Sequence, residues 1–182
     1  MKKIETYDSF RPQIKSGDLL GFQHNQLGWG IEDIQVRIVG FFEKSDIVHA
    51  GTACWLNGRL FVLEAVSPYP RIALLSNRDD FYHLPLSAPW AQSTQDFGFS
   101  LLGNDAIKYS RAAAIAAGLH KLPPPTKYTT KWECAQLSWM IAHFDGIDLG
   151  PDLTPDGLMA YAGKSLGLDP TLVLQEKDNA YV

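Results

Sequence analysis

The chain of 182 residues lacks long apolar runs, and no segment approaches the roughly 18 apolar residues that a membrane-spanning helix needs. It also lacks a run of lysines or arginines, and its formal net charge is −4, so nucleic acid and anionic lipid are disfavoured as partners. Residues 1–8 hold two lysines with no apolar stretch after them, unlike a secretory signal. We therefore expect a cytoplasmic protein, with phage origin or export by another route left open.

Cysteine is scarce too, since Cys54 and Cys134 are the two in the chain. They can form one bridge in an oxidising compartment or stay free thiols in a reducing one, and we favour the second. No His, Cys or Asp residues fall at ligand spacing within one element, so we predict neither a metal site nor a cofactor. The sequence has no internal repeat or low-complexity segment. Its length predicts a single domain over residues 1–182, and the oligomeric state stays open.

Turn signals divide the first half of the chain into short apolar runs of the kind that form strands. Helical spacing of apolar residues predicts one helix near residues 31–42. The strands are expected at 18–22, 47–55, 60–66, 72–75 and 81–86.

The second half of the chain predicts helices. One is capped by Asn104 or Asp105, runs to about Lys121 and stops before three prolines at 123–125. Another ends at the Asp145-Gly146 pair, and a short one is expected near 155–162. Residues 87–104 and the C-terminal tail carry no assignment.

Asn57-Gly58 predicts a tight hairpin between the second and third strands, because both central positions of a type I′ turn need positive φ. In that register Gly51 faces Glu64. His49 is two residues before Gly51, so its side chain lies on the same face of the sheet. His49 and Glu64 then sit on a diagonal about 7–8 Å apart between backbones. Gly51 has no side chain to obstruct that diagonal. Cys54 faces the opposite side and is interpreted as a small buried hydrophobe.

Cys134 lies at a helix start. Thr130-x-x-Glu133 fits a capping box, which predicts Thr130 as the N-cap and Cys134 as the fourth helical residue. The helix dipole there favours a thiolate over a thiol. Apolar residues then surround almost the whole helix, which predicts a buried, central element and keeps open the alternative that Cys134 is simply one more core residue.

The histidines differ in their fitness to act as a base for this thiol. His143 is nine residues further along the same helix, which puts it roughly 13 Å away. His120 ends a helix, where a positive charge complements the dipole. His24 and His83 have no carboxylate beside them in any register that the sequence supplies. His49 has Glu64, although a strand histidine and an edge carboxylate with purely structural roles remain the alternative.

A thiolate attacks an acyl group when a neighbouring imidazole generates or stabilises it, and a third polar group holds the ring in the productive tautomer. Cys134, His49 and Glu64 together have the residue types for this chemistry. The expected oxyanion donor is the backbone N–H of Cys134. Gln136 is disfavoured, because it lies roughly 160° around the helix from Cys134.

The order of four short motifs resembles the circularly permuted NlpC/P60 enzymes of the YiiX type, which are papain-like cysteine hydrolases. The motifs are Ser16-Gly17-Asp18-Leu19-Leu20, Ile47-Val48-His49-Ala50-Gly51, Val62-Leu63-Glu64-Ala65-Val66 and Glu133-Cys134-Ala135-Gln136-Leu137. The resemblance covers about residues 14–160. It implies an α+β, circularly permuted papain-like fold, in which an antiparallel sheet packs against a central helix that starts near Cys134.

The resemblance also implies that Cys134 is the nucleophile, His49 the base and Glu64 the third member of a triad. The chain departs from the family pattern at Val48, at Trp132-Glu133 and at Ala135-Gln136, which bears on substrate preference.

Three functions follow from these residues and this resemblance. The first is a cysteine peptidase or amidase that forms an acyl-enzyme on small peptide amides, with peptides of bacterial cell walls as the implied substrates. The second is a lipid or fatty-acyl amidase or acyltransferase on the same fold. The third is a non-catalytic binding module, in which Cys134 would behave as an ordinary thiol.

Overall fold

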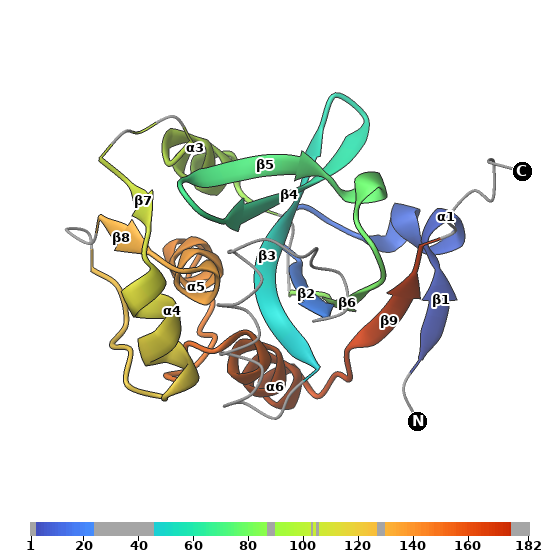
Figure 1. Ribbon diagram of the computed structural model, residues 1–182. Helices are drawn as coiled ribbons and strands as arrows, with labels where there is room; N and C mark the ends of the chain where they lie inside the picture. Colours follow the sequence, from blue (N-terminus) through green and yellow to red (C-terminus); the bar gives the residue numbers. More distant parts are fainter. Residues whose placement is uncertain are drawn as a thin grey trace, which may run out of the picture.

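The computed structural model describes residues 3–23, 46–86, 90–102, 104, 106–126 and 130–175. Over these residues the protein is a mixed α+β structure, in which a large sheet packs against helices (Figure 1). The helix expected at residues 31–42 lies outside the described residues, and so does His24.

The large sheet has seven strands within this part of the chain, in the order β1-β9-β6-β2-β3-β4-β5. Its centre has the expected antiparallel pairing, and β1 and β9 form a parallel pair at one edge. A small second sheet pairs β7 with β8 in parallel. The strands are β1 (Ile4–Thr6), β2 (Leu19–Gln23), β3 (Ile47–Leu56), β4 (Arg59–Ala65), β5 (Pro70–Leu74), β6 (Phe81–Leu84), β7 (Lys108–Tyr109), β8 (Lys131–Trp132) and β9 (Thr171–Leu174). Every strand predicted from the apolar runs is present, with ends shifted by one or two residues.

The β3–β4 hairpin confirms the register that Asn57-Gly58 predicts. Asn57 has φ 47° and Gly58 has φ 73°, both in the left-handed region that this turn requires. Leu56 pairs with Arg59, and the ladder continues to Thr52 and Leu63.

The described helical segments are α1 (Tyr7–Phe10), η1 (Arg11–Gln13), η3 (Leu75–Asn77), α3 (Gln92–Ser100), α4 (Arg111–Gly118), α5 (Cys134–Phe144) and α6 (Pro155–Leu166). Helix α3 falls in the stretch for which the sequence made no prediction. Helix α6 is four residues longer than expected, because Gly167 ends it in the left-handed conformation with φ 66°.

The predicted start of α4 was wrong. Neither Asn104 nor Asp105 caps it, and its N-cap is Ser110, whose hydroxyl accepts a hydrogen bond from Ala113 N at 3.1 Å. The residues just before Ser110 belong to β7, which pairs with β8 and so holds the backbone extended. Pairing between distant segments overrode the local cap signal.

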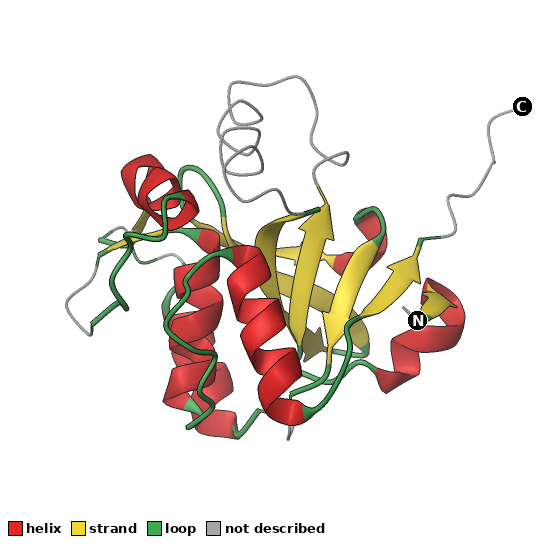
Figure 2. Cartoon of the chain, turned by 90° about the horizontal axis from the view of Figure 1, so that it is seen from below, coloured by secondary structure: helices red, strands yellow, loops and turns green. Residues whose placement is uncertain are grey.

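The core lies on both faces of the large sheet, and successive strand residues divide between them. Leu19 packs with Ala135 of α5 and Leu158 of α6, whereas its neighbour Leu20 packs with Phe10 of α1 on the other face. Figure 2 shows the longer helices gathered along one side of the sheet. Among the described residues, no helix is long and apolar enough to cross a membrane.

Candidate active site

Helix α5 starts at Cys134, and the predicted N-cap at Thr130 was wrong. The N-cap is Glu133, with φ −107° and ψ 176°, because Lys131–Trp132 is extended in β8 and the helix cannot begin earlier. Cys134 is therefore the first helical residue and not the fourth. At this position the thiol lies at the positive end of the helix dipole.

A capping box holds this helix start in place, three residues later than the sequence predicts it. The Glu133 carboxylate accepts hydrogen bonds from Ala135 N at 2.9 Å and from Gln136 N. The Gln136 side chain in turn accepts from Glu133 N and donates to Pro123 O, both at 3.3 Å. Its amide serves the cap.

The thiol of Cys134 also contacts Glu133. Its Sγ donates to Glu133 Oε2 at 3.3 Å, and both residues are buried. Burial raises the pKa of Glu133 to about 7, against the hydrogen bonds from Ala135, Gln136 and Cys134 that lower it. A second ionisable group therefore lies directly against the thiol.

The predicted diagonal between His49 and Glu64 is a hydrogen bond. His49 Nε2 lies 2.7 Å from Glu64 Oε2, across the point where the ladder between β3 and β4 ends. Gly51 lies close to the neighbouring strand, since a Cβ there would clash with Val62 Cγ2 at 2.4 Å and would contact Glu64 Cβ at 3.5 Å.

Two arginines that sequence reasoning missed also bind Glu64. Arg71 Nε donates to Glu64 Oε1 at 2.8 Å, and Arg78 Nη2 donates to the same oxygen. Glu64 itself is fully buried. Burial pushes the pKa of Glu64 upward, but His49 first, then Arg78 and Arg71, outweigh it and lower the pKa to about 2. Glu64 is a permanently ionised carboxylate at neutral pH.

The contacts of the two arginines with Glu64 differ in whether the sequence can predict them. Arg71 faces Glu64 in the register of β4 and β5, and the turn residues Pro68-Tyr69-Pro70 at the junction of these strands are a local signal from which that second hairpin can be predicted. Arg78 follows η3, and no local pattern relates it to Glu64.

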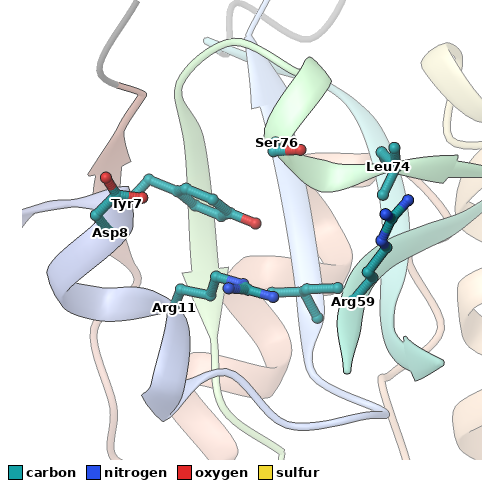
Figure 3. A pocket seen from close by; sticks show the side chains of 7 residues that line it. Tyr7, Asp8, Arg11, Arg59, Leu74 and Ser76 are labelled. Carbon is teal, nitrogen blue, oxygen red and sulfur yellow. The ribbon is translucent and has the colours of Figure 1, made fainter. Parts of the chain in front are cut away.

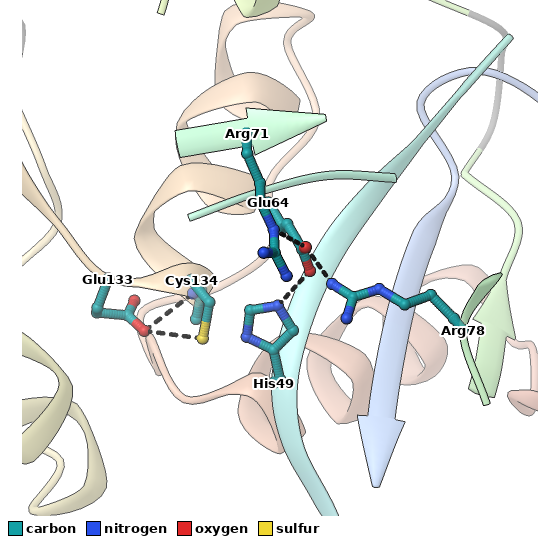
Figure 4. A network of polar contacts seen from close by, with 7 residues as sticks. His49, Glu64, Arg71, Arg78, Glu133 and Cys134 are labelled. Carbon is teal, nitrogen blue, oxygen red and sulfur yellow. Dashed lines mark hydrogen bonds and ion pairs between the residues drawn. The ribbon is translucent and has the colours of Figure 1, made fainter. Parts of the chain in front are cut away.

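Figure 4 shows how these groups lie around the thiol. The Sγ of Cys134 points toward the ring of His49, on the side away from Glu64. Because Nε2 is bonded to Glu64, the nitrogen on the thiol side of the ring is Nδ1. The fold thus brings together side chains from α5, β3 and β4.

Other histidines also have acidic partners, which corrects one expectation. His83 Nε2 lies 2.7 Å from Asp18 Oδ2 in the sheet, so His49 is not alone in having a carboxylate beside it. His120 forms an exposed pair with Asp152 at 3.2 Å.

No group of three or more His, Cys, Asp or Glu side chains that could hold a metal ion occurs among the described residues. Both cysteines are unbridged. Burial raises the pKa of Cys54 to about 11, as suits a thiol that is part of the core.

A hollow of about 360 Å³ opens elsewhere on the molecule and contains none of the residues around Cys134 (Figure 3). The guanidinium groups of Arg11 and Arg59 line it together with the ring of Tyr7. Arg11 is already engaged there, since it donates to Gly58 O at 2.9 Å.

Comparisons with known proteins give a likeness to solved structures but none to sequence families. No protein-family model matches the chain, and no curated protein matches its sequence. The fold is similar to the crystal structure of metalloprotein yiiX from Escherichia coli O157:H7, with a TM-score of 0.45 and 15% sequence identity. That alignment covers 90% of this chain and 89% of the other.

Proposed function

We propose that the protein is a cysteine hydrolase that cleaves an amide bond through an acyl-enzyme, with Cys134 as nucleophile, His49 as base and Glu64 as the orienting group. One observation supports this most. The Sγ at the start of α5 points toward a histidine ring whose far nitrogen is bonded to a buried, ionised carboxylate. Nucleophile, base and orienter stand in the order that thiol hydrolysis requires.

In the proposed reaction, His49 takes the proton of Cys134 to form a thiolate–imidazolium pair. The thiolate attacks the carbonyl carbon, the C–N bond breaks, and the imidazolium gives its proton to the leaving amine. Water then attacks the thioester, with His49 accepting a proton from it, and the acid leaves while the thiol is restored. Glu64 keeps the ring oriented and stabilises its positive charge throughout.

The family proposed for this chain is the circularly permuted papain-like group. Its supporting features are the chain order of the three side chains and the packing of a helix that starts at the cysteine against an antiparallel sheet. We propose small peptides, such as those of bacterial cell walls, as the substrate class. Two arginines and two carboxyl groups near the thiol make its described surroundings polar, which disfavours a fatty-acyl substrate.

The pH dependence of iodoacetamide alkylation tests this proposal. We expect the modification of Cys134 to reach half its maximal rate well below the free-thiol value of about 8.5. Cys134→Ala should abolish the fast modification. Cys54→Ala is the matched control and should leave it unchanged, because burial raises the pKa of Cys54 to about 11 and so disfavours its reactive thiolate. A profile that follows an ordinary thiol would sink the catalytic assignment.

Intact-mass measurement with peptide amides tests the reaction itself. Incubation with a panel of cell-wall stem peptides should give a transient mass increase on Cys134, equal to the acyl fragment, together with released amine. His49→Ala should not accumulate the adduct. Turnover that survives in Cys134→Ala would contradict the covalent mechanism.

A further inference from the structure

We propose that Arg71 is a specificity residue that binds a carboxylate of the substrate beside the reacting carbonyl. The proposal rests on the function proposed for Cys134 and His49, and it narrows their substrates to acyl compounds that carry a negative charge close to the scissile bond.

The charges around Glu64 do not balance. One carboxylate accepts hydrogen bonds from two guanidinium groups, which stay protonated at every pH of interest, and from His49 as well. In the contacts of Glu64 with other described residues, two fixed positive charges therefore meet one negative charge. The excess of one positive charge is present before His49 takes any proton.

Arg78 is the less exposed of the two arginines, with 25% of its side chain accessible. Its Nη2 binds Glu64, its guanidinium lies 5.5 Å from the ring centroid of Phe22, and its Nε is buried without a hydrogen-bond partner. Of the two arginines, Arg78 is therefore the less accessible to a substrate.

Arg71 is placed differently. Its side chain is 52% exposed, and the hydrogen bond it makes within the described part of the chain uses Nε. The planar guanidinium has a second edge, formed by the two terminal nitrogens, which suits a carboxylate in the two-pronged manner typical of arginine. The excess positive charge therefore lies at a group that solvent and substrate can reach.

The direction of Arg71 relates this charge to the proposed chemistry. In Figure 4 its side chain descends from β5 over the ring of His49, on the same side of Glu64 as Cys134. The other carboxyl near the thiol, Glu133, lies on the opposite side of the sulfur from His49. A carboxylate of a substrate bound at the thiol is thus attracted by Arg71, on the His49 side of the sulfur.

Alkylation by two reagents of different charge tests the proposal without a known substrate. Iodoacetate carries a carboxylate, iodoacetamide is neutral, and both react with the thiolate of Cys134. The measured quantity is the rate constant for iodoacetate divided by that for iodoacetamide. The thiolate fraction cancels in this ratio. We expect the ratio in the wild type to exceed that of N-acetylcysteine by about fivefold, as for one positive charge a few ångströms from the carboxylate in a largely aqueous setting. Arg71→Gln should return it to the N-acetylcysteine value.

Arg59→Gln is the matched control, since it removes the same charge from an exposed arginine outside the site, and it should keep the wild-type ratio. If Arg71→Gln slows both reagents equally and leaves the ratio unchanged, Arg71 only positions Glu64 and the inference is overturned. If the wild-type thiol reacts with both reagents like N-acetylcysteine, the proposed function fails, and the inference fails with it.

A matched pair of peptide amides gives the second readout. One carries a free carboxylate next to the cleaved bond and the other has it as a carboxamide. We expect Arg71→Gln to raise KM about tenfold for the first peptide and to leave KM for the second unchanged, with kcat little altered. Equal changes for both peptides would refute carboxylate recognition.

Discussion

The sheet holds two histidine–carboxylate pairs with the same bond and different surroundings. His49 Nε2 lies 2.7 Å from Glu64, and His83 Nε2 lies 2.7 Å from Asp18. His49 belongs to β3 and His83 to β6, and both strands pair with β2. As hydrogen-bonded units, the two pairs are alike.

They differ in what meets the other ring nitrogen. The His49 side chain is 14% exposed and its ring faces the thiol of Cys134 (Figure 4). The His83 side chain is 3% exposed, its ring packs edge-on to Phe10 at 5.1 Å, and its Nδ1 is buried without a hydrogen-bond partner. A substrate has no path to that nitrogen.

The carboxylates are also satisfied differently. Asp18 accepts hydrogen bonds from the backbone N–H of Lys15 at 2.7 Å and of Leu86 at 3.1 Å. Glu64 accepts from two arginine side chains. Backbone donors tie Asp18 to loop positions, whereas arginines leave charge at the surface beside Glu64. A histidine–carboxylate pair is therefore a structural unit, and its position beside a thiol makes one of the two a candidate for catalysis.

Replacing each histidine by alanine should separate the two roles most strongly. His49→Ala should slow alkylation of Cys134 at pH 6 by roughly 100-fold, since an unassisted thiol is less than about 1% ionised there. His83→Ala should leave the rate of folded molecules within about twofold. Iodoacetamide kinetics, with circular dichroism to confirm folding, measure both. Equal losses in the two variants would abolish the distinction.

The loss of stability should rank the two variants in the opposite order, with His83→Ala the more damaging. Removing one partner of a buried hydrogen bond costs about 1–3 kcal/mol, because the other partner is left unsatisfied. We therefore expect His83→Ala to lower the free energy of unfolding by about 3 kcal/mol and His49→Ala by clearly less. Urea unfolding followed by tryptophan fluorescence measures this. His83→Gln, which retains a hydrogen-bonding side chain, serves if His83→Ala does not fold.

The pair at His49 should also have a characteristic response to acid. The pKa of Glu64 is lowered from 4.5 to about 2, so its contribution is complete above pH 4.5 and is lost as pH falls through 2. Glu64→Gln should then destabilise the protein by about 3 kcal/mol at pH 6, and the difference should shrink toward zero near pH 2. Unfolding free energies at several pH values test this, with exposed Asp169→Asn as control. A difference independent of pH would contradict it.

Glu133 should give the smallest effect, with the opposite sign. Its pKa is raised from 4.5 to about 7, so the folded state holds a proton that the unfolded chain has lost. Stability should therefore fall as pH rises, by about 2 kcal/mol between pH 5 and pH 7. Glu133→Gln should remove this slope. A wild-type curve that is flat over the same range would show that Glu133 is already ionised at pH 5.

Local patterns accounted for the part of the candidate site that lies in one hairpin. Asn57-Gly58 needs positive φ at both positions, so the turn determined the pairing of β3 with β4 and hence the meeting of His49 with Glu64. Once the turn sets the register, the face of each residue follows, because the side-chain period of a strand is two.

Local sequence patterns did not predict the contacts between distant segments. Asp18 meets His83 because β2 pairs with β6, which are separated by more than fifty residues of chain, and no turn sets that register. Arg78 reaches Glu64 from the end of η3. The N-cap of α5 is Glu133 and not the predicted Thr130, because Lys131–Trp132 pairs with β7 in a sheet.

The sequence by itself determined the residue types, the strands β2 to β6, and the hairpin that joins His49 to Glu64, because short-range backbone geometry is encoded in a few neighbouring residues. Tertiary structure decided that Cys134 is the first residue of α5 and that its thiol points toward His49. It also decided that two arginines surround one carboxylate. Packing of whole elements sets these contacts, since no single segment buries its apolar face or satisfies its charges alone.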